Sequence, residues 1–227
     1  MAYKKFPWSI LNGSSASSAS GWTSFIEKND IPVDEIMEEA LEGITPWMAT
    51  CATGRPDLVR WFGERLHAQG KIEELHEGLI NCAMFGRKQA LIELLMIRKD
   101  GKTILDPATR TRDRIDLPTV IAYMDWPENM IQEMTEARPE LEPLLGNARK
   151  TVKPVKPGHA VAEQIRHLIT GNPQLWEGGY ILNWSNRLKI HMLSSLPENA
   201  RNTQSNQGNT QAIENGNGLN AAKSRLR

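Results

Sequence analysis

The chain contains the stretch Gly43-Ile-Thr-Pro-Trp-Met-Ala-Thr-Cys-Ala-Thr-Gly54, followed by Arg55-Pro-Asp-Leu-Val-Arg-Trp-Phe62, and this stretch decides the predicted fold. The hydroxyl of Thr45 is suited to cap a helix, and Pro46 fits a first helical turn. Gly54 can adopt the positive φ that reverses the chain between two antiparallel helices. The stretch therefore predicts a helical hairpin, with helices over residues 46–53 and 56–68.

A similar pattern returns about one period later. Gly86 lies 32 residues after Gly54. A more divergent third unit follows, in which Pro118 lies 72 residues after Pro46, and the excess over two periods falls in an enlarged loop around residues 107–112. Apolar residues at helical spacing predict the helices of these two units over residues 76–85, 88–98, 118–124 and 127–137.

The first unit resembles an ankyrin repeat, and the resemblance extends more weakly over residues 43–137. The matching residues are Gly43, Thr45, Pro46, Gly54, Leu58 and Val59. The chain departs from the family pattern at Trp47, Met48 and Gly63. The resemblance implies an all-α fold built as an ankyrin-like array of helical hairpins, and it implies a role in binding other proteins. A generic helical domain is the alternative, because any all-helical domain contains paired amphipathic helices.

Composition divides the chain into four segments. Residues 1–26 include a Ser-rich run and predict a flexible arm. Residues 27–147 form the predicted repeat domain, which begins with a helix capped by Asp30 and ending by Gly43. Residues 148–196 predict an extended proline-containing linker at 150–157 and two C-terminal helices, over 160–170 and 181–196. Residues 197–227, rich in Asn, Gln and Gly, predict a disordered tail.

Charge is distributed unevenly along a chain whose formal net charge is zero. Residues 27–146 hold 23 acidic and 14 basic side chains, whereas residues 147–227 hold 4 acidic and 11 basic ones. This split predicts that the basic part folds against the acidic part, with an acidic partner as the alternative. Only two cysteines are present, which favours a reducing compartment, and no long apolar run predicts a membrane span. We therefore expect a cytoplasmic protein.

The sequence carries no Gly-rich phosphate loop, His-Glu-x-x-His motif or nucleophile elbow. His67 and His76 could bind a metal together with Glu73 or Glu77, but such clusters are usually solvated helix ends, and we favour that interpretation. Cys51 and Cys82 occupy nearly equivalent repeat positions and are expected in the core. We therefore predict a protein that is not an enzyme and that has no catalytic residues, no cofactor and no metal.

The resemblance implies that loop tips and the first helices contact a protein partner. The predicted partner-binding residues are Leu41, Glu42, Ile44, Trp47, Met48, Arg110 and Arg112. Trp8 and Trp22 are predicted to anchor the N-terminal arm onto this domain or onto another subunit. Trp184 and the basic residues after it could instead face nucleic acid, which we consider a minor alternative without any base-reading motif.

Three functions fit these features. The leading hypothesis is a non-enzymatic adaptor or scaffold. The second is a structural component of a virion or another large multi-subunit assembly, with the terminal arms binding neighbouring subunits. The third is a secreted bacterial effector that acts in a host cell, suggested by the Ser-rich start.

Overall fold

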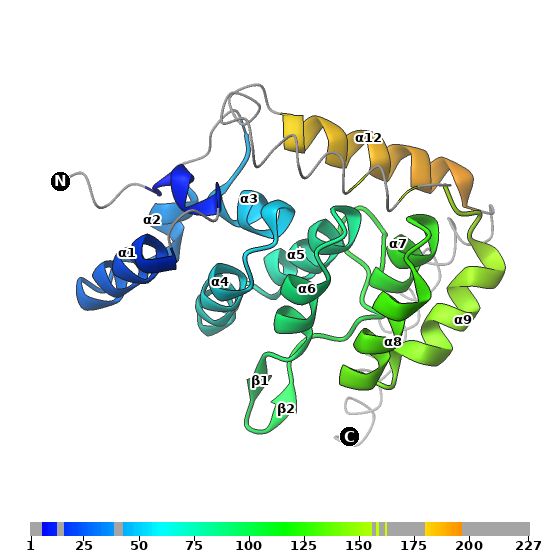
Figure 1. Ribbon diagram of the computed structural model, residues 1–227, viewed down its shortest axis with the longest axis horizontal. Coiled ribbons are helices and arrows are strands. Elements are labelled where there is room, and N and C mark those ends of the chain that lie inside the picture. Colours follow the sequence, from blue (N-terminus) through cyan, green and yellow to red (C-terminus); the bar gives the residue numbers. More distant parts are fainter. Residues whose placement is uncertain are drawn as a thin grey trace, which may run out of the picture.

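The computed structural model describes residues 6–12, 16–38, 43–155, 158, 162 and 180–196, and this part of the chain is mostly helical (Figure 1). Its elements are η2 (Trp8–Asn12), α1 (Ala16–Lys28), α2 (Val33–Met37), α3 (Pro46–Thr53), α4 (Pro56–Ala68), α5 (Ile72–Met84), α6 (Lys88–Leu95), β1 (Arg98–Lys99), β2 (Lys102–Thr103), α7 (Leu117–Tyr123), α8 (Glu128–Ala137), α9 (Leu141–Thr151) and α12 (Tyr180–Ser195). Strands β1 and β2 form a small antiparallel hairpin. None of the described helices is both long enough and apolar enough to span a membrane.

The first hairpin forms as its sequence predicts. The Thr45 hydroxyl accepts a hydrogen bond from the Met48 amide at 3.2 Å, and Pro46 begins α3. Gly54 ends this helix with a φ of +74°. An added Cβ at this position would lie 2.3 Å from the Arg87 side chain, so the close approach of the second unit also requires glycine. The predicted bounds of α3 and α4 are confirmed.

The helices of the central region form two layers (Figure 1). The first layer consists of α3, α5 and α7, in which each helix contacts the next. The second layer consists of α4, α6 and α8, arranged in the same order. Helix α9 packs against α7 and α8, while α12 crosses over the first layer.

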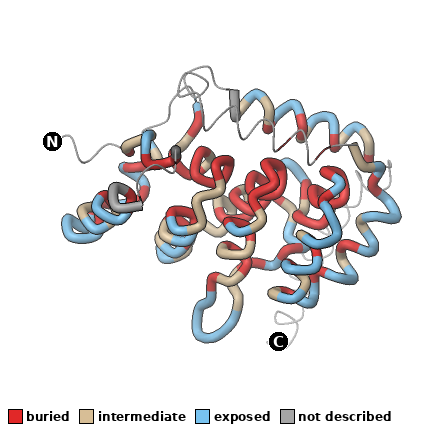
Figure 2. The backbone as a smooth tube through the Cα atoms, viewed as in Figure 1, coloured by how far each residue is buried: buried red, intermediate tan, exposed pale blue. Residues whose placement is uncertain are grey.

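The apolar faces of the two layers meet in one continuous core. Phe62, Leu79 and Leu94 are among its fully buried side chains. Figure 2 shows that buried residues are concentrated in the central helices. Gly63, which stands where the ankyrin pattern has a leucine, lies where an added Cβ would be 2.6 Å from the Ile97 side chain. The glycine thus lets α4 approach the end of α6 closely, and the helices pack together in spite of the departure from the family pattern.

The prediction of a flexible arm is wrong for the described part of residues 1–26. Helix α1 places Ala19, Trp22 and Ile26 in the core, and Phe6 packs edge-to-face on Trp22 with ring centroids 5.4 Å apart. Trp22 also contacts Trp61 of α4, at 5.3 Å between centroids. The Ser-rich composition concealed an apolar row at spacings of three and four residues, which is the signature of an amphipathic helix.

Other boundaries also differ from those predicted. Helix α9 (Leu141–Thr151) crosses the predicted domain boundary at 147–148. Pro143 does not break this helix, because it lies in the first turn, where proline is tolerated. Asp30 caps no helix; it has a φ of +47° in the turn after α1, and Pro32 precedes α2. The predicted linker begins inside α9, and the Val155 amide donates to the Tyr123 carbonyl at 2.8 Å. The C-terminal helix predicted at 181–196 is confirmed as α12, whereas the predicted helix over 160–170, Ala162 apart, and the predicted tail lie outside the described residues.

Replacement of Trp22 tests whether the N-terminal segment belongs to the core. We expect Trp22→Ala to lower the free energy of unfolding by about 3 to 5 kcal/mol, since it removes a large buried ring. Ser24→Ala, on the exposed face of the same helix, is the matched control and should change it by less than about 0.5 kcal/mol. Chemical denaturation measures the free energy of unfolding of both variants. Equal effects would show that α1 does not pack on the helices of the central region.

Candidate partner-binding surface

A hollow lies on the first layer, between α3 and α5 on one side and α12 on the other. Side chains from four segments form its walls: Met48 of α3; Glu73, Glu74 and Glu77 of α5; Arg112 of the loop that precedes α7; and Ser185 and Lys189 of α12. We call it the acidic hollow. It brings together segments more than a hundred residues apart in the sequence.

The floor of the acidic hollow depends on a close contact between Trp47 and Gly78. The Trp47 indole N–H donates to the Glu74 carbonyl at 2.8 Å. An added Cβ on Gly78 would lie 2.2 Å from Cζ2 of the indole, so only glycine lets the ring lie across α5. The contact turns one face of α5 toward α3 and leaves the neighbouring face, with Glu73, Glu77 and Asn81, toward the hollow and α12. These three residues, four apart, form what we call the polar row.

Charged pairs surround the hollow. Arg112 Nη2 donates to Glu73 Oε2 at 2.6 Å. Lys189 Nζ donates to Glu77 Oε2 at 3.1 Å and also to Asp113 Oδ2. Burial alone would lower the pKa of Lys189, but the hydrogen bonds and attraction from Asp113 and Glu77 outweigh burial and raise it. Lys189 is thus held as a cation between two carboxylates, and the predicted docking of the basic part on the acidic part is confirmed at this point.

Helix α12 closes the hollow through one of its faces. Ser185 Oγ donates to Asn81 Oδ1 at 3.0 Å, and the two residues are 1% and 3% exposed. Leu188 and Met192, one and two turns further along, are buried. Near the end of the helix, the His191 ring contacts the Tyr123 hydroxyl.

The structure brings only some of the predicted contact residues to this surface. Met48 is half-buried and lines the hollow with Arg112, and Trp47 lies beneath them as the floor. Ile44 is fully buried, so the prediction that it contacts a partner is wrong. Leu41 and Glu42 lie outside the described residues.

The two predicted anchor tryptophans do not line the hollow and instead pack within the fold. Trp22 is 2% exposed, and Trp8 is half-buried, with its ring centroid 5.2 Å from that of Phe6. The sequence predicted that these tryptophans anchor the arm either onto this domain or onto another subunit, and in the structure they pack on this domain.

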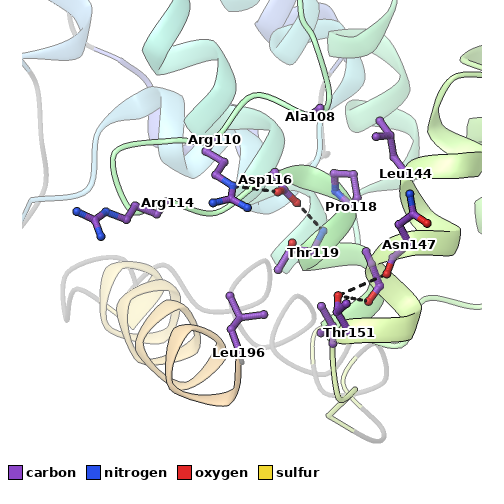
Figure 3. Close-up of a pocket in the computed structure, with 12 residues that line it drawn as sticks. Ala108, Arg110, Arg114, Asp116, Pro118, Thr119, Leu144, Asn147, Thr151 and Leu196 are labelled. Atoms are coloured by element: carbon purple, nitrogen blue, oxygen red, sulfur yellow. Dashed lines mark hydrogen bonds and ion pairs between the residues drawn. The ribbon is translucent and has the colours of Figure 1, made fainter. Parts of the chain in front are cut away.

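Arg110 belongs to a second hollow, between the loop before α7 and helix α9 (Figure 3). Its Nε lies 3.5 Å from Asp116 Oδ2. Asp116 in turn caps α7, because its Oδ1 accepts from the Thr119 amide at 2.9 Å. Both charged groups are therefore engaged in holding the loop against α7, and Arg110 and Arg112, two positions apart, face different hollows.

The polar row, Ser185 and Lys189 were not predicted from the sequence. Glu73 and Glu77 recur four residues apart, which predicts a common helix face, but nothing in the sequence pairs that face with α12. The hydrogen bonds Ser185–Asn81 and Lys189–Glu77 span 104 and 112 residues.

The histidines and cysteines give no further site in the described residues. His76 Nδ1 lies 3.0 Å from the Ile72 carbonyl within its own helix, and no group of three metal-binding side chains occurs in the described ranges. Cys51 and Cys82 are buried as free thiols. Burial, together with a hydrogen bond to Cys82, raises the pKa of Cys51 well above its usual value, which disfavours the reactive thiolate. The side chains that are available for binding a partner are therefore the charged and polar ones that line the acidic hollow.

Two glycine substitutions test the Trp47–Gly78 contact. We expect Gly78→Ala to lower the free energy of unfolding by about 1 to 3 kcal/mol, because its methyl group collides with a buried ring. Gly146→Ala is the matched control: this glycine also lies within a helix, but nothing lies within 4 Å of an added Cβ. It should raise the free energy of unfolding by about 0.5 to 1 kcal/mol. Denaturant titration distinguishes the two, and a stabilising Gly78→Ala would contradict the described floor.

In comparisons with known proteins, no family model, no curated protein and no solved structure matches this chain. The resemblance of residues 43–137 to ankyrin repeats therefore stays a prediction that rests on the quoted residues. Function has to be argued from the geometry of the surface itself.

Proposed function

We propose that this protein is a non-enzymatic interaction module whose first helix layer binds another protein at the acidic hollow. The observation that carries the proposal is the hollow itself. The half-buried Met48 supplies apolar surface there, above the buried Trp47 ring and directly beside the three glutamates of α5. Interaction surfaces commonly combine an apolar centre with a charged rim that steers the partner.

The arrangement of the helices supports an ankyrin-like array. The helix pairs α3–α4, α5–α6 and α7–α8 follow one another in the order of the three sequence units. The β1–β2 hairpin and the long loop before α7 separate the second unit from the third, where the family resemblance implies a projecting turn. In such arrays the first helices and the projecting turns form the binding face, and here the Arg112 loop joins α3 and α5 in lining the hollow.

The packing of the N-terminal segment favours the adaptor over the assembly component. The assembly hypothesis requires tryptophans that are free to bury against neighbouring subunits. Trp22 is already buried between Phe6 and Trp61 of its own chain. The effector hypothesis differs from the adaptor hypothesis only in where the protein acts, and an effector would bind its host protein at the same acidic hollow.

A charge reversal in the hollow tests this function. Tagged full-length chain is used to capture proteins from the native source, and Glu74→Lys is compared with wild type by quantitative mass spectrometry. We expect Glu74→Lys to reduce the yield of a defined set of partners more than about tenfold, since one reversed charge at a complementary interface costs several kcal/mol.

Glu64→Lys is the matched control, because it makes the same substitution on an exposed position of α4, in the second layer. It should leave the captured set unchanged. If Glu74→Lys and Glu64→Lys retain the same proteins at the same yields, with both variants folded by circular dichroism, then the acidic hollow is not the binding surface.

A further inference from the structure

Helix α12 lies on the first layer in the manner of a bound peptide. Ser185, Leu188 and Met192 face the layer at spacings of three and four residues and are buried. Ile190, on the opposite side, is 68% exposed. Amphipathic helices that dock into a surface of another protein present their anchors with this spacing.

The surface beneath α12 is partly apolar and partly polar. Leu188 and Met192 of α12 belong to the hydrophobic core, and Ser185 Oγ also lies 4.0 Å from the Met84 sulfur. The polar groups that α12 contacts are Glu77 and Asn81 of the polar row, Asp113 of the loop, and the Tyr123 hydroxyl. We call these four residues the α12 seat. The interface between the two layers, by contrast, is formed by leucine, isoleucine and phenylalanine side chains. Water can solvate the groups of the seat, and most of the core residues come from α3 to α8, so we expect the stack to keep most of its core when α12 leaves.

The acidic hollow runs along the edge of the seat. Ser185 and Lys189 form one wall of it, and Met48 and Glu73 form the other. An incoming chain can therefore touch the glutamates of α5 before α12 has moved. A partner helix that first binds beside α12 in this way does not require α12 to leave its seat beforehand.

We infer that the α12 seat is a docking site for a basic amphipathic helix of a partner protein, and that α12 occupies it as an intramolecular substitute which the partner displaces. This inference rests on the proposed function and specifies its partner.

The seat also specifies the pattern of that helix. A serine or threonine must reach Asn81, as Ser185 does at 3.0 Å. An apolar residue follows three positions later, a lysine or arginine follows four positions later between Glu77 and Asp113, and a second apolar residue follows after seven. The glutamates of the hollow favour further basic residues on the side that faces them.

A linked helix competes strongly with a free one. Because α12 belongs to the same chain, its effective concentration at the seat is on the order of millimolar. The apparent affinity of an external helix falls by the fraction of molecules in which the seat is open. Weakening α12 in the chain should therefore strengthen binding of an added helix.

A synthetic fluorescent peptide with the sequence of residues 180–196 tests this, by anisotropy titration with full-length chains. We expect it to bind Met192→Asp and Lys189→Glu chains at least about tenfold more tightly than the wild-type chain. Ile190→Asp makes the same substitution on the exposed side of α12 and should bind the peptide as wild type does. A peptide that itself carries Lys189→Glu should bind the Met192→Asp chain at least about tenfold more weakly.

Equal affinity of the peptide for all four chains would overturn the inference, and so would equal binding of the two peptides. If Met192→Asp unfolds the stack, Lys189→Glu decides alone, because it changes only a charged contact of the seat, and the mutant peptide is then titrated against it. A wild-type dimer that dissociates on Lys189→Glu, measured by light scattering, would assign the seat to a second copy and also overturn it. Failure here with hollow-dependent capture intact would remove the role of α12 and leave the proposed function standing.

Discussion

The Trp47 ring lies across Gly78, and the orientation of α5 within the first layer depends on this contact. One row of α5, with Glu74, Gly78 and Cys82, faces α3, so the next row, with Glu73, Glu77 and Asn81, must face outward along the same layer. A polar row in the middle of a helical stack would be costly if another apolar layer covered it. Here it meets the serine and the lysine of α12, which satisfy it with hydrogen bonds.

The two faces of the first layer therefore differ in kind. Toward the second layer it buries aliphatic and aromatic side chains, which hold the stack together through the hydrophobic effect. Toward α12 it presents carboxylates, an amide and a phenol, beside the apolar contacts that bury Leu188 and Met192. We attribute stability mainly to the first face and propose that recognition uses the second, from which α12 is displaced while the fold persists. This division is what we expect of a protein whose task is to bind.

Local signals in the sequence predicted those parts of the fold that local chemistry determines. Thr45, Pro46 and Gly54 set the ends of α3 and α4, and both helices have the predicted bounds. Helix α1 was not predicted, because serine content outweighed the spacing of Ala19, Trp22 and Ile26. Helix α9 was not predicted either, although Pro143 lies in its first turn, where proline is tolerated. Of the candidate surface, Trp47, Met48 and Arg112 were predicted. The pairing of Asn81 with Ser185 was not, because a contact across 104 residues leaves no local signal.

Hydrogen exchange of the backbone amides in the full-length chain tests most directly whether α12 is a separable occupant of an independently stable stack. The account predicts that amides of α12 exchange through local opening, at a free energy well below that of amides in α4, α5 and α6, which exchange only through global unfolding. Addition of denaturant should then lower protection in the stack while that of α12 stays nearly constant. If α12 and α5 instead exchange at one common free energy and respond to denaturant alike, α12 is an integral part of the fold, and the account is contradicted.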